Sequence, residues 1–201
     1  NKAFDDIFDE AYAATDVTIT PKLSFTSQTS VALEGLPETM VEDVRAVDGV
    51  GEAFGYISGQ GAIAIDGEVV ETGGSPTLYF SYVPSELSAT SYVEGSPPEG
   101  PGDLGISQGV AEDEGLTIGS PVTAITDTGA YETTVTGIFK FASEGSLGGS
   151  ILLNMTFDDG QAWFDMAGRV SEIDVSAAEG VSARVLAARI RAVLPTPAAG
   201  K

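Results

Sequence analysis

Two acidic clusters carry the side chains that could bind a metal ion. They are Asp158-Asp159 and Glu112-Asp113-Glu114, and carboxylate oxygens suit hard cations such as Ca²⁺. Neither cluster has the alternating spacing of a dedicated calcium loop. Acids at the start of a helix are stabilised by its dipole, so we interpret both clusters as helix-start acids. The sequence therefore predicts no metal site and no cofactor.

The triplet Asp127-Thr128-Gly129 could do acid–base chemistry. It looks like the signature of aspartic peptidases, which pair two carboxylates that share one proton. A single copy could serve only in a homodimer. Asp-x-Gly is also ordinary turn chemistry, and strand-like runs flank the triplet at 122–126 and 133–141. A hairpin turn is our interpretation, and a peptidase that uses Asp127 is the less favoured alternative.

Two glycine-rich stretches do not complete a nucleotide-binding motif. Gly145–Ser150 lacks the lysine of a phosphate loop, and Gly55–Gly61 does not make a dinucleotide fingerprint. Both are interpreted as flexible connections.

The composition removes most catalytic chemistries. The chain of 201 residues has no histidine and no cysteine, so it cannot build a Ser-His-Asp or Cys-His mechanism, a disulfide or a thiolate metal site. We predict that it is not an enzyme and that it has no catalytic, cofactor-binding or metal-binding residues.

The charge balance limits the partners. Thirty acids face nine bases, for a formal net charge of −21. Phosphate backbones would be repelled, which argues against nucleic acid. Anionic lipid headgroups would be repelled as well, so peripheral membrane binding through basic patches is not expected. No apolar run approaches the roughly 20 residues that span a bilayer, and the abrupt start and end suggest a piece of a longer protein.

The first third of the sequence predicts an α/β arrangement. Helical spacing of apolar residues marks an acidic amphipathic helix at Phe4–Tyr12. Strands are expected at 16–19 and 23–26. A helix opens at Leu36-Pro37-Glu38 and is stopped by Asp48-Gly49, and a strand follows at 50–57.

The middle, from Ser58 to Gly149, is rich in glycine, proline and serine and predicts a small β-rich lobe. Gly95–Gly105 is expected to be an exposed loop, and Gly109–Leu116 one or two helical turns. The aromatic residues here are interpreted as core, with a partner-contact patch as the alternative. Strand-like runs lie at 62–65, 77–83, 122–126 and 133–141, and the aromatic residues are Tyr79, Phe80, Tyr82 and Tyr92.

The α/β pattern resumes after the middle. Strands are expected at 151–154 and 170–175. Between them Thr156 should cap a short helix, with Asp159 three residues on and Trp163 and Phe164 facing inward. A final amphipathic helix is expected at 181–194.

The ordered set of landmarks resembles the periplasmic core domain of MacB-like and FtsX-like ABC permeases. No single motif carries the resemblance, and Ser120 stands where that family usually has an aspartate. The matching segments are Thr15–Ile19, Met40–Val50, Gly109–Gly119, Thr133–Phe139 and Glu172–Gly180 with the helix that follows.

The resemblance implies an α+β fold of two lobes. Residues 1–57 and 148–201 would form a membrane-proximal α/β lobe, and 58–147 an inserted β-rich lobe. It also implies transmembrane helices just before Asn1 and soon after Lys201, so that the domain is anchored on the extracytoplasmic side of the cell membrane.

The same resemblance implies a function without chemistry. The domain would relay conformational change in export and contact cargo or an accessory protein. Its partners would be a cytoplasmic ABC ATPase, through the full-length permease, and a second permease in a homodimer. An extracellular ligand-binding or sensor module, for a peptide antibiotic or a lipid, is the alternative.

Overall fold

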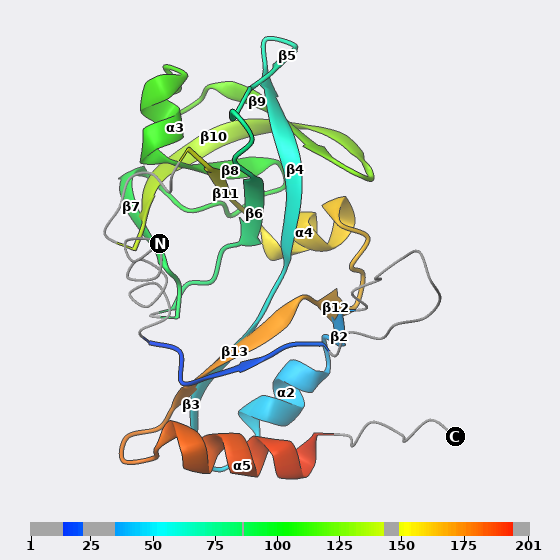
Figure 1. Cartoon of the computed structure of the whole chain (residues 1–201), viewed down its shortest axis with the longest axis vertical. Coiled ribbons are helices and arrows are strands. Elements are labelled where there is room, and N and C mark those ends of the chain that lie inside the picture. The colour runs from blue at the N-terminus through cyan, green and yellow to red at the C-terminus, as the bar shows by residue number, and fades with distance from the viewer. Residues whose placement is uncertain (1–13, 22–34, 86, 143–148, 195–201) are drawn as a thin grey trace.

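The computed structural model describes residues 14–21, 35–85, 87–142 and 149–194, and it has the α+β fold that the sequence predicts. Three sheets and four helices are present in these ranges, and they gather in two lobes (Figure 1). We call residues 58–164 the barrel lobe, and residues 14–57 with 165–194 the terminal lobe.

The terminal lobe is a three-stranded antiparallel sheet with helices on one face. The sheet order is β1-β13-β3. Alternation along β13 turns Ile173 and Val175 toward the helices, and the helices bury Val44 and Leu186 against that face. A two-stranded ribbon of β2 and β12 lies beside the sheet. The elements are β1 (Val17–Ile19), β2 (Leu36–Pro37), α2 (Met40–Arg45), β3 (Val50–Tyr56), β12 (Arg169–Val170), β13 (Glu172–Ala177) and α5 (Ala183–Val193).

The barrel lobe contains one eight-stranded sheet that closes on itself. The order β4-β6-β11-β8-β10 is joined at both ends by β9, which pairs with β10 and with β4. Six strands therefore form a ring, with β5 and β7 at its margins. The elements are β4 (Ser58–Ile65), β5 (Glu68–Val69), β6 (Thr77–Ser81), β7 (Thr90–Gly95), β8 (Asp103–Ser107), α3 (Gln108–Asp113), β9 (Pro121–Thr126), β10 (Gly129–Phe141), β11 (Ile151–Met155) and α4 (Phe157–Trp163).

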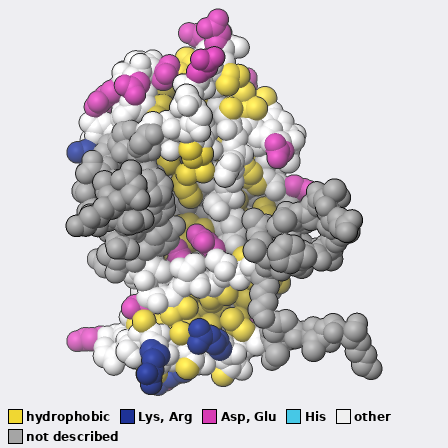
Figure 2. Space-filling view, viewed as in Figure 1, with side chains coloured by type: hydrophobic (Ala, Val, Ile, Leu, Met, Phe, Trp, Pro, Cys, Tyr) yellow, Lys and Arg dark blue, Asp and Glu magenta, His cyan; other side chains and the backbone are white. Residues whose placement is uncertain are grey.

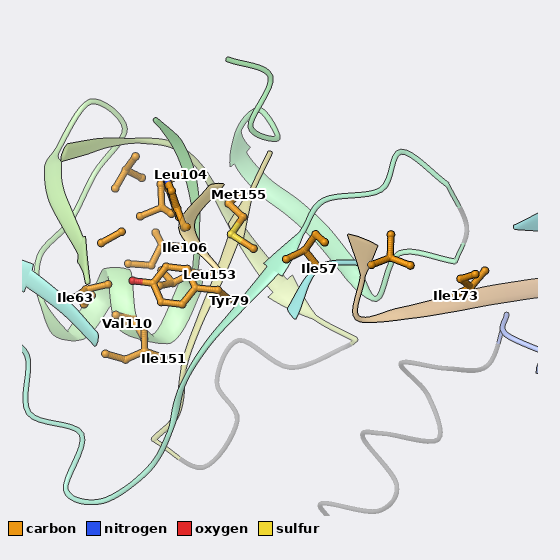
Figure 3. Packing of buried hydrophobic residues seen from close by; sticks show 14 of the residues in the cluster. Ile57, Ile63, Tyr79, Leu104, Ile106, Val110, Ile151, Leu153, Met155 and Ile173 are labelled. Carbon is orange, nitrogen blue, oxygen red and sulfur yellow. The ribbon is translucent and has the colours of Figure 1, made fainter. Parts of the chain in front are cut away.

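The barrel is filled by side chains rather than by solvent. Leu104, Ile106 and Leu153 are fully buried inside it (Figure 3). The Tyr79 ring lies among them, and its hydroxyl donates to the Ala62 carbonyl at 2.6 Å. A buried phenol needs such a partner because an unpaired hydroxyl in an apolar interior is costly. Tyr79 is thus a core residue, as predicted.

Most predicted elements are present. The helix predicted to open at Leu36–Glu38 instead begins at Met40 as α2, because Leu36 and Pro37 form β2 and pair with β12. Gly49 after it has φ +94°, a left-handed conformation that favours glycine. The predicted cap is confirmed, because the Thr156 hydroxyl accepts from the Asp159 N–H at 3.1 Å. Trp163 is buried as predicted. Phe4–Tyr12, 23–26 and most of Gly145–Ser150 lie outside the described residues.

Two loop predictions were wrong. Gly95–Gly105 is not simply an exposed loop, because it ends inside β8, where Leu104 is fully buried. Gly55–Gly61 is not a flexible connection, because it runs from β3 into β4. Glycine is needed at 59 since a β-carbon there would lie 2.2 Å from the Phe164 ring.

The boundary predicted at 147/148 does not follow the strand pairing. β11 pairs with β6 on one side and β8 on the other, so it belongs to the barrel sheet. The chain returns to the terminal lobe only after α4 (Figure 1). The division into two separate domains stays a prediction, and we place its second boundary after Phe164.

Candidate functional site

The connection from the terminal lobe to the barrel lobe lies beside a residue of the terminal lobe that is far away in sequence. This outgoing connection is Tyr56-Ile57-Ser58, between β3 and β4, and the neighbouring residue is Ser171, between β12 and β13. The Ser171 N–H donates to the Tyr56 carbonyl at 2.6 Å. The Ser58 N–H donates to the Ser171 hydroxyl at 3.0 Å. The outgoing connection is therefore hydrogen-bonded to the terminal lobe at Ser171.

The outgoing connection is also held by the barrel. Ile57 is fully buried, its N–H donates to the Ser81 hydroxyl at 3.0 Å, and its carbonyl accepts from the Ser81 N–H at 2.9 Å. A residue that is fixed by backbone hydrogen bonds on one side and by packing on the other moves with its neighbours. Ile57 thus couples the end of β6 to the junction.

A loop of the barrel lobe contacts the outer face of the terminal sheet. This loop follows β6, and its described residues are 82–85 and 87–89. The Tyr56 hydroxyl donates to the Leu87 carbonyl at 3.0 Å, and the Ser85 hydroxyl donates to the Glu52 carboxylate at 2.6 Å. Val83 and Leu87 are buried. The lobes are thus joined by polar contacts at the rim and apolar contacts beneath.

Two carboxyl groups lie on the same outer face of β13. Glu172 and Asp174 are two residues apart, so their side chains point the same way. Both line a small cavity of about 40 Å³ with Asn154 and Tyr56, room for about one water molecule. The Thr18 hydroxyl donates to the Asp174 carboxylate at 2.7 Å. The junction therefore encloses two acids among uncharged neighbours.

Burial changes the acidity of this pair. Loss of solvation, the larger cause, and the nearby Asp174 charge together raise the pKa of Glu172 from 4.5 to about 7. Burial also raises the pKa of Asp174, against the lowering effect of the Thr18 hydrogen bond. Glu172 can thus gain or lose a proton near neutral pH.

A groove opens between α2 and the loop that follows β6. Its volume is about 640 Å³. The walls are largely apolar, with Glu38 and Glu42 among the lining residues, and the Arg45 guanidinium lies over the Phe54 ring at 5.3 Å. Residues from both lobes contribute to the lining, which includes Val41, Phe54, Tyr82, Val83, Pro84 and Phe157. A shift between the lobes would change its shape.

The structure puts the Asp-Thr-Gly triplet in the predicted turn. β9 and β10 pair antiparallel up to Thr126 and Gly129, which leaves Asp127 and Thr128 as the turn. The hydroxyls of Thr126 and Thr128 both donate to the Trp163 carbonyl, at 2.8 and 2.6 Å. These contacts hold the end of α4 against the barrel. Their role is structural.

Asp127 is not paired with a second carboxylate by any hydrogen bond in the described part of the chain. It lines a groove that Glu172 also lines, with Ser58 and Phe164. The arrangement lacks the shared-proton contact that an aspartic peptidase requires. The peptidase reading stays an untested alternative.

The acidic clusters do not converge. Asp158 and Asp159 lie in the first turn of α4, as predicted, and the Asp159 carboxylate accepts from the Gly102 N–H at 3.0 Å. The Glu112–Glu114 cluster lies at the end of α3 rather than at its start, which corrects that part of the prediction. Within the described ranges, no group of three acidic side chains is placed to hold a metal ion.

The other aromatic residues form a second cluster. Tyr92 contacts Phe139 with ring centroids 5.7 Å apart, and its hydroxyl donates to the Asn154 carbonyl oxygen at 3.1 Å. Phe80 stacks on Phe141 at 6.4 Å. Tyr82 packs edge-on against Tyr92 and also lines the interlobe groove. Most of these aromatic side chains pack inside the protein, and Tyr82 also lines the groove.

Sequence reasoning missed the junction carboxylates as a unit. Glu172 and Asp174 are predicted only as part of a strand, because alternation alone does not say what covers each face. Leu87 lines the cavity that holds them and comes from a loop more than 80 residues away in sequence. No local pattern links those segments.

No family model matches this sequence, and no curated protein matches it either. Two solved structures share its fold. The periplasmic region of MacB from Actinobacillus actinomycetemcomitans superposes with a TM-score of 0.64 and 11% identity, over 92% of this chain and 86% of that one. The extracellular domain of the noncanonic ABC-type transporter YknZ from Gram-positive bacteria gives 0.63 and 16%, over 88% and 92%.

In the described part of the chain, no helix has the length and apolar character needed to cross a bilayer. The two structural neighbours are domains that lie outside the cytoplasm, and the superpositions take in most of both lobes. The chain therefore has the fold of the extracytoplasmic domains of ABC transporter permeases.

Proposed function

We propose that this chain is the extracytoplasmic domain of an ABC transporter permease, and that it relays conformational change between the membrane and a partner or cargo without catalysis. The observation that carries the proposal is the fold shared with two such domains over about nine-tenths of the chain. In the full-length permease, a cytoplasmic ATPase would drive the cycle, and a homodimer would present two copies.

The junction supports a mechanical role. Relative motion of packed units occurs at a few connecting residues. Here the outgoing connection Tyr56–Ser58, the returning chain after Phe164 and one covering loop join the lobes. Rotation of one lobe must therefore be taken up at these connections and at their contacts with Ser171, Ser85 and Leu87. A non-catalytic role is supported by the absence of histidine and cysteine from the whole sequence.

A crosslink across the junction tests the relay. Because the chain has no cysteine, the double variant Glu52→Cys, Ser85→Cys can be joined by a short thiol-reactive bridge in the full-length permease. Those two side chains are in contact across the junction. We expect the bridged permease to lose ATP-driven export, with recovery when a cleavable bridge is cut.

The control joins two strands of one lobe. Thr123 and Glu132 are direct cross-strand partners in β9 and β10, so Thr123→Cys, Glu132→Cys places the same bridge where no relative motion is required. Export should survive it. Full export by the permease bridged at 52 and 85 would contradict the relay.

A ligand-binding module is the second candidate function, and the interlobe groove of about 640 Å³ favours it. Arg45 also lines this groove and pairs with Glu42, so its apolar walls and Glu38 would suit an amphipathic ligand with one cationic end. Calorimetric titration of the domain with such a peptide should then show saturable heat that Phe54→Ala reduces at least tenfold in affinity. No saturable heat would exclude this function.

A further inference from the structure

The basic side chains of the described chain are gathered at one end. All five arginines lie in the terminal lobe and three of them are on α5, whereas Lys140 is the one basic residue of the barrel lobe that the structure describes. In Figure 2 the dark blue side chains concentrate at the α5 end, and acidic side chains dominate the opposite end. The described terminal lobe still has ten acids against these five arginines, so the local cationic surface is confined to α5, which has no acid of its own.

Three of these arginines are already engaged. Arg45 pairs with Glu42 at 2.6 Å and donates to the Ala53 carbonyl. Arg169 donates to the Gly35 carbonyl at 2.8 Å. Arg189 pairs with Asp48 at 2.9 Å. These contacts stabilise the terminal lobe, and the acids compensate the charges of Arg45 and Arg189.

Arg184 and Arg191 have no acidic group within ion-pair distance in the described residues. They are seven residues apart, which is two helical turns, so they share one face of α5. That face is opposite the buried Leu186 and Ile190. Both arginines are exposed and therefore point away from the body of the protein.

The rest of the exposed surface of α5 is apolar or small. Val185 is 44% exposed and Val193 is 54% exposed, and these are two of the few large apolar side chains at the surface of the described chain. Ala188 lies between the two arginines and is exposed as well. α5 contains no acidic residue. A helix surface of arginine, valine and alanine is the composition of segments that lie at a lipid interface.

We propose that this surface, the α5 outer face formed by Arg184, Val185, Ala188 and Arg191, rests on the anionic headgroups of the bilayer that anchors the permease. The partner is an anionic lipid surface because the face combines uncompensated cations with exposed apolar groups. Acids of the barrel lobe do not cancel the attraction, since that lobe lies at the end of the molecule opposite α5 (Figure 1) and charge interactions decay over about 8 Å in physiological salt.

Two arginines make only a weak contact with a membrane. The inference therefore rests on the proposed function, in which the domain is already held beside the bilayer. Each basic residue near an anionic surface shifts binding about fivefold, the equivalent of about 1 kcal/mol. That is too little to recruit a free acidic protein, but it suffices to orient a domain that is already tethered beside the membrane.

The test uses the full-length permease in lipid nanodiscs with a single spin label at Ala188→Cys. The same label at Ala130→Cys, an exposed alanine of the barrel lobe, is the matched control. Accessibility to oxygen and to a water-soluble nickel chelate is compared in phosphatidylglycerol and phosphatidylcholine discs. We expect the label at 188 to favour oxygen in the anionic discs alone, and the label at 130 to be indifferent.

Charge variants make the result specific. Arg184→Gln and Arg191→Gln should each lower the lipid-contacting population about fivefold. Lys140→Gln, which removes the same charge from the barrel lobe, should leave it unchanged. The proposal would be overturned if the label at 188 were equally exposed to the water-soluble chelate in both lipids. It would also be overturned if the label were equally shielded in both lipids, because a protein would then cover the face. Neither outcome bears on the proposed relay of conformational change, which the crosslink across the junction tests separately.

Discussion

The two lobes enclose their sheets in different ways. The barrel closes its strands into a ring, and its central strand β11 is buried at every position. The terminal sheet has three strands and one apolar face, and its other face carries Glu172 and Asp174 beneath a loop. The barrel has no open edge along its ring, whereas the terminal sheet depends on what covers it.

That difference suggests where the molecule can change shape. In a closed ring every strand is hydrogen-bonded on both sides, so no single strand can separate without breaking hydrogen bonds to two neighbours. A covering loop held by the Tyr56 and Ser85 hydrogen bonds can separate without unfolding either sheet. We infer that the barrel moves as one body and that adjustment occurs at the outer face of the terminal sheet.

The largest expected effect comes from Leu153→Ala in β11. Leu153 is fully buried and its strand is paired on both sides, so the cavity cannot collapse, and we expect the upper part of the usual range, about 4 to 5 kcal/mol in free energy of unfolding. Ile173→Ala in the terminal sheet should cost less, about 2 to 3 kcal/mol. Urea unfolding measures both. An equal or reversed order would break the contrast between the lobes.

Glu172→Gln should change how stability depends on pH. The native pKa of Glu172 is about 7, above its ordinary 4.5, so the native state holds the proton more tightly than the unfolded chain does. The free energy of unfolding should therefore fall as pH rises from about 4.5 to 7, by up to about 3 kcal/mol. The Gln variant should lose most of that slope and be the more stable protein at pH 8.

Thermal or urea unfolding at several pH values measures this slope. The control is Glu132→Gln, which removes an exposed carboxylate from the barrel lobe and should keep the wild-type slope. A variant at 172 that keeps the slope would mean that the outer face of the terminal sheet is solvated like any other surface.

Thr156→Ala should cost about 1 kcal/mol, because the Thr156 hydroxyl caps α4 through the Asp159 N–H. Ser107 begins α3 in the same way, but its buried hydroxyl has no hydrogen-bond partner in the described residues. Ser107→Ala should therefore change stability by less than about 0.5 kcal/mol. Similar losses of stability in the two variants would contradict this difference between the Thr156 and Ser107 hydroxyls.

Asp127→Ala is expected to have the smallest effect, within about 0.5 kcal/mol of the wild-type stability. The turn is held by Thr126 and Thr128 and not by the aspartate. Export by the full permease should be unchanged. Peptide cleavage by the wild-type domain that is blocked by a pepstatin-type inhibitor and lost in this variant would instead establish the peptidase.

Local patterns predicted elements better than they predicted their neighbours. The apolar run 151–154 indicated a strand, but only the fold pairs β11 with β6, more than 70 residues earlier. β8 was obscured because Gly105 interrupts the Leu104 and Ile106 alternation. Glycine is needed there since a β-carbon would lie 2.3 Å from the Tyr92 hydroxyl. Tyr92 lies outside β8, in β7, so the sequence of β8 alone gives no sign of this contact.

The functional inference came from the order of many weak landmarks, and the two structural neighbours support the same kind of domain. The junction and the α5 outer face could not be predicted in that way. Both depend on which charges find partners in three dimensions. Among the residues that the structure describes, Arg189 has such a partner in Asp48 and Arg184 has none. A count of charges along the sequence does not distinguish an arginine that has an acidic partner from one that has none.

The continuity of β3 into β4 has a consequence for how such proteins can vary. Ala53, Ile57 and Ile63 are odd-numbered and all buried, so one alternation of inward and outward side chains runs through both lobes with only Ile57 between the strands. Inserting a single residue there would turn Ile63 out of the barrel or Ala53 away from the helices. Exchanging barrels between relatives would thus succeed only when an even number of residues is gained or lost at that connection.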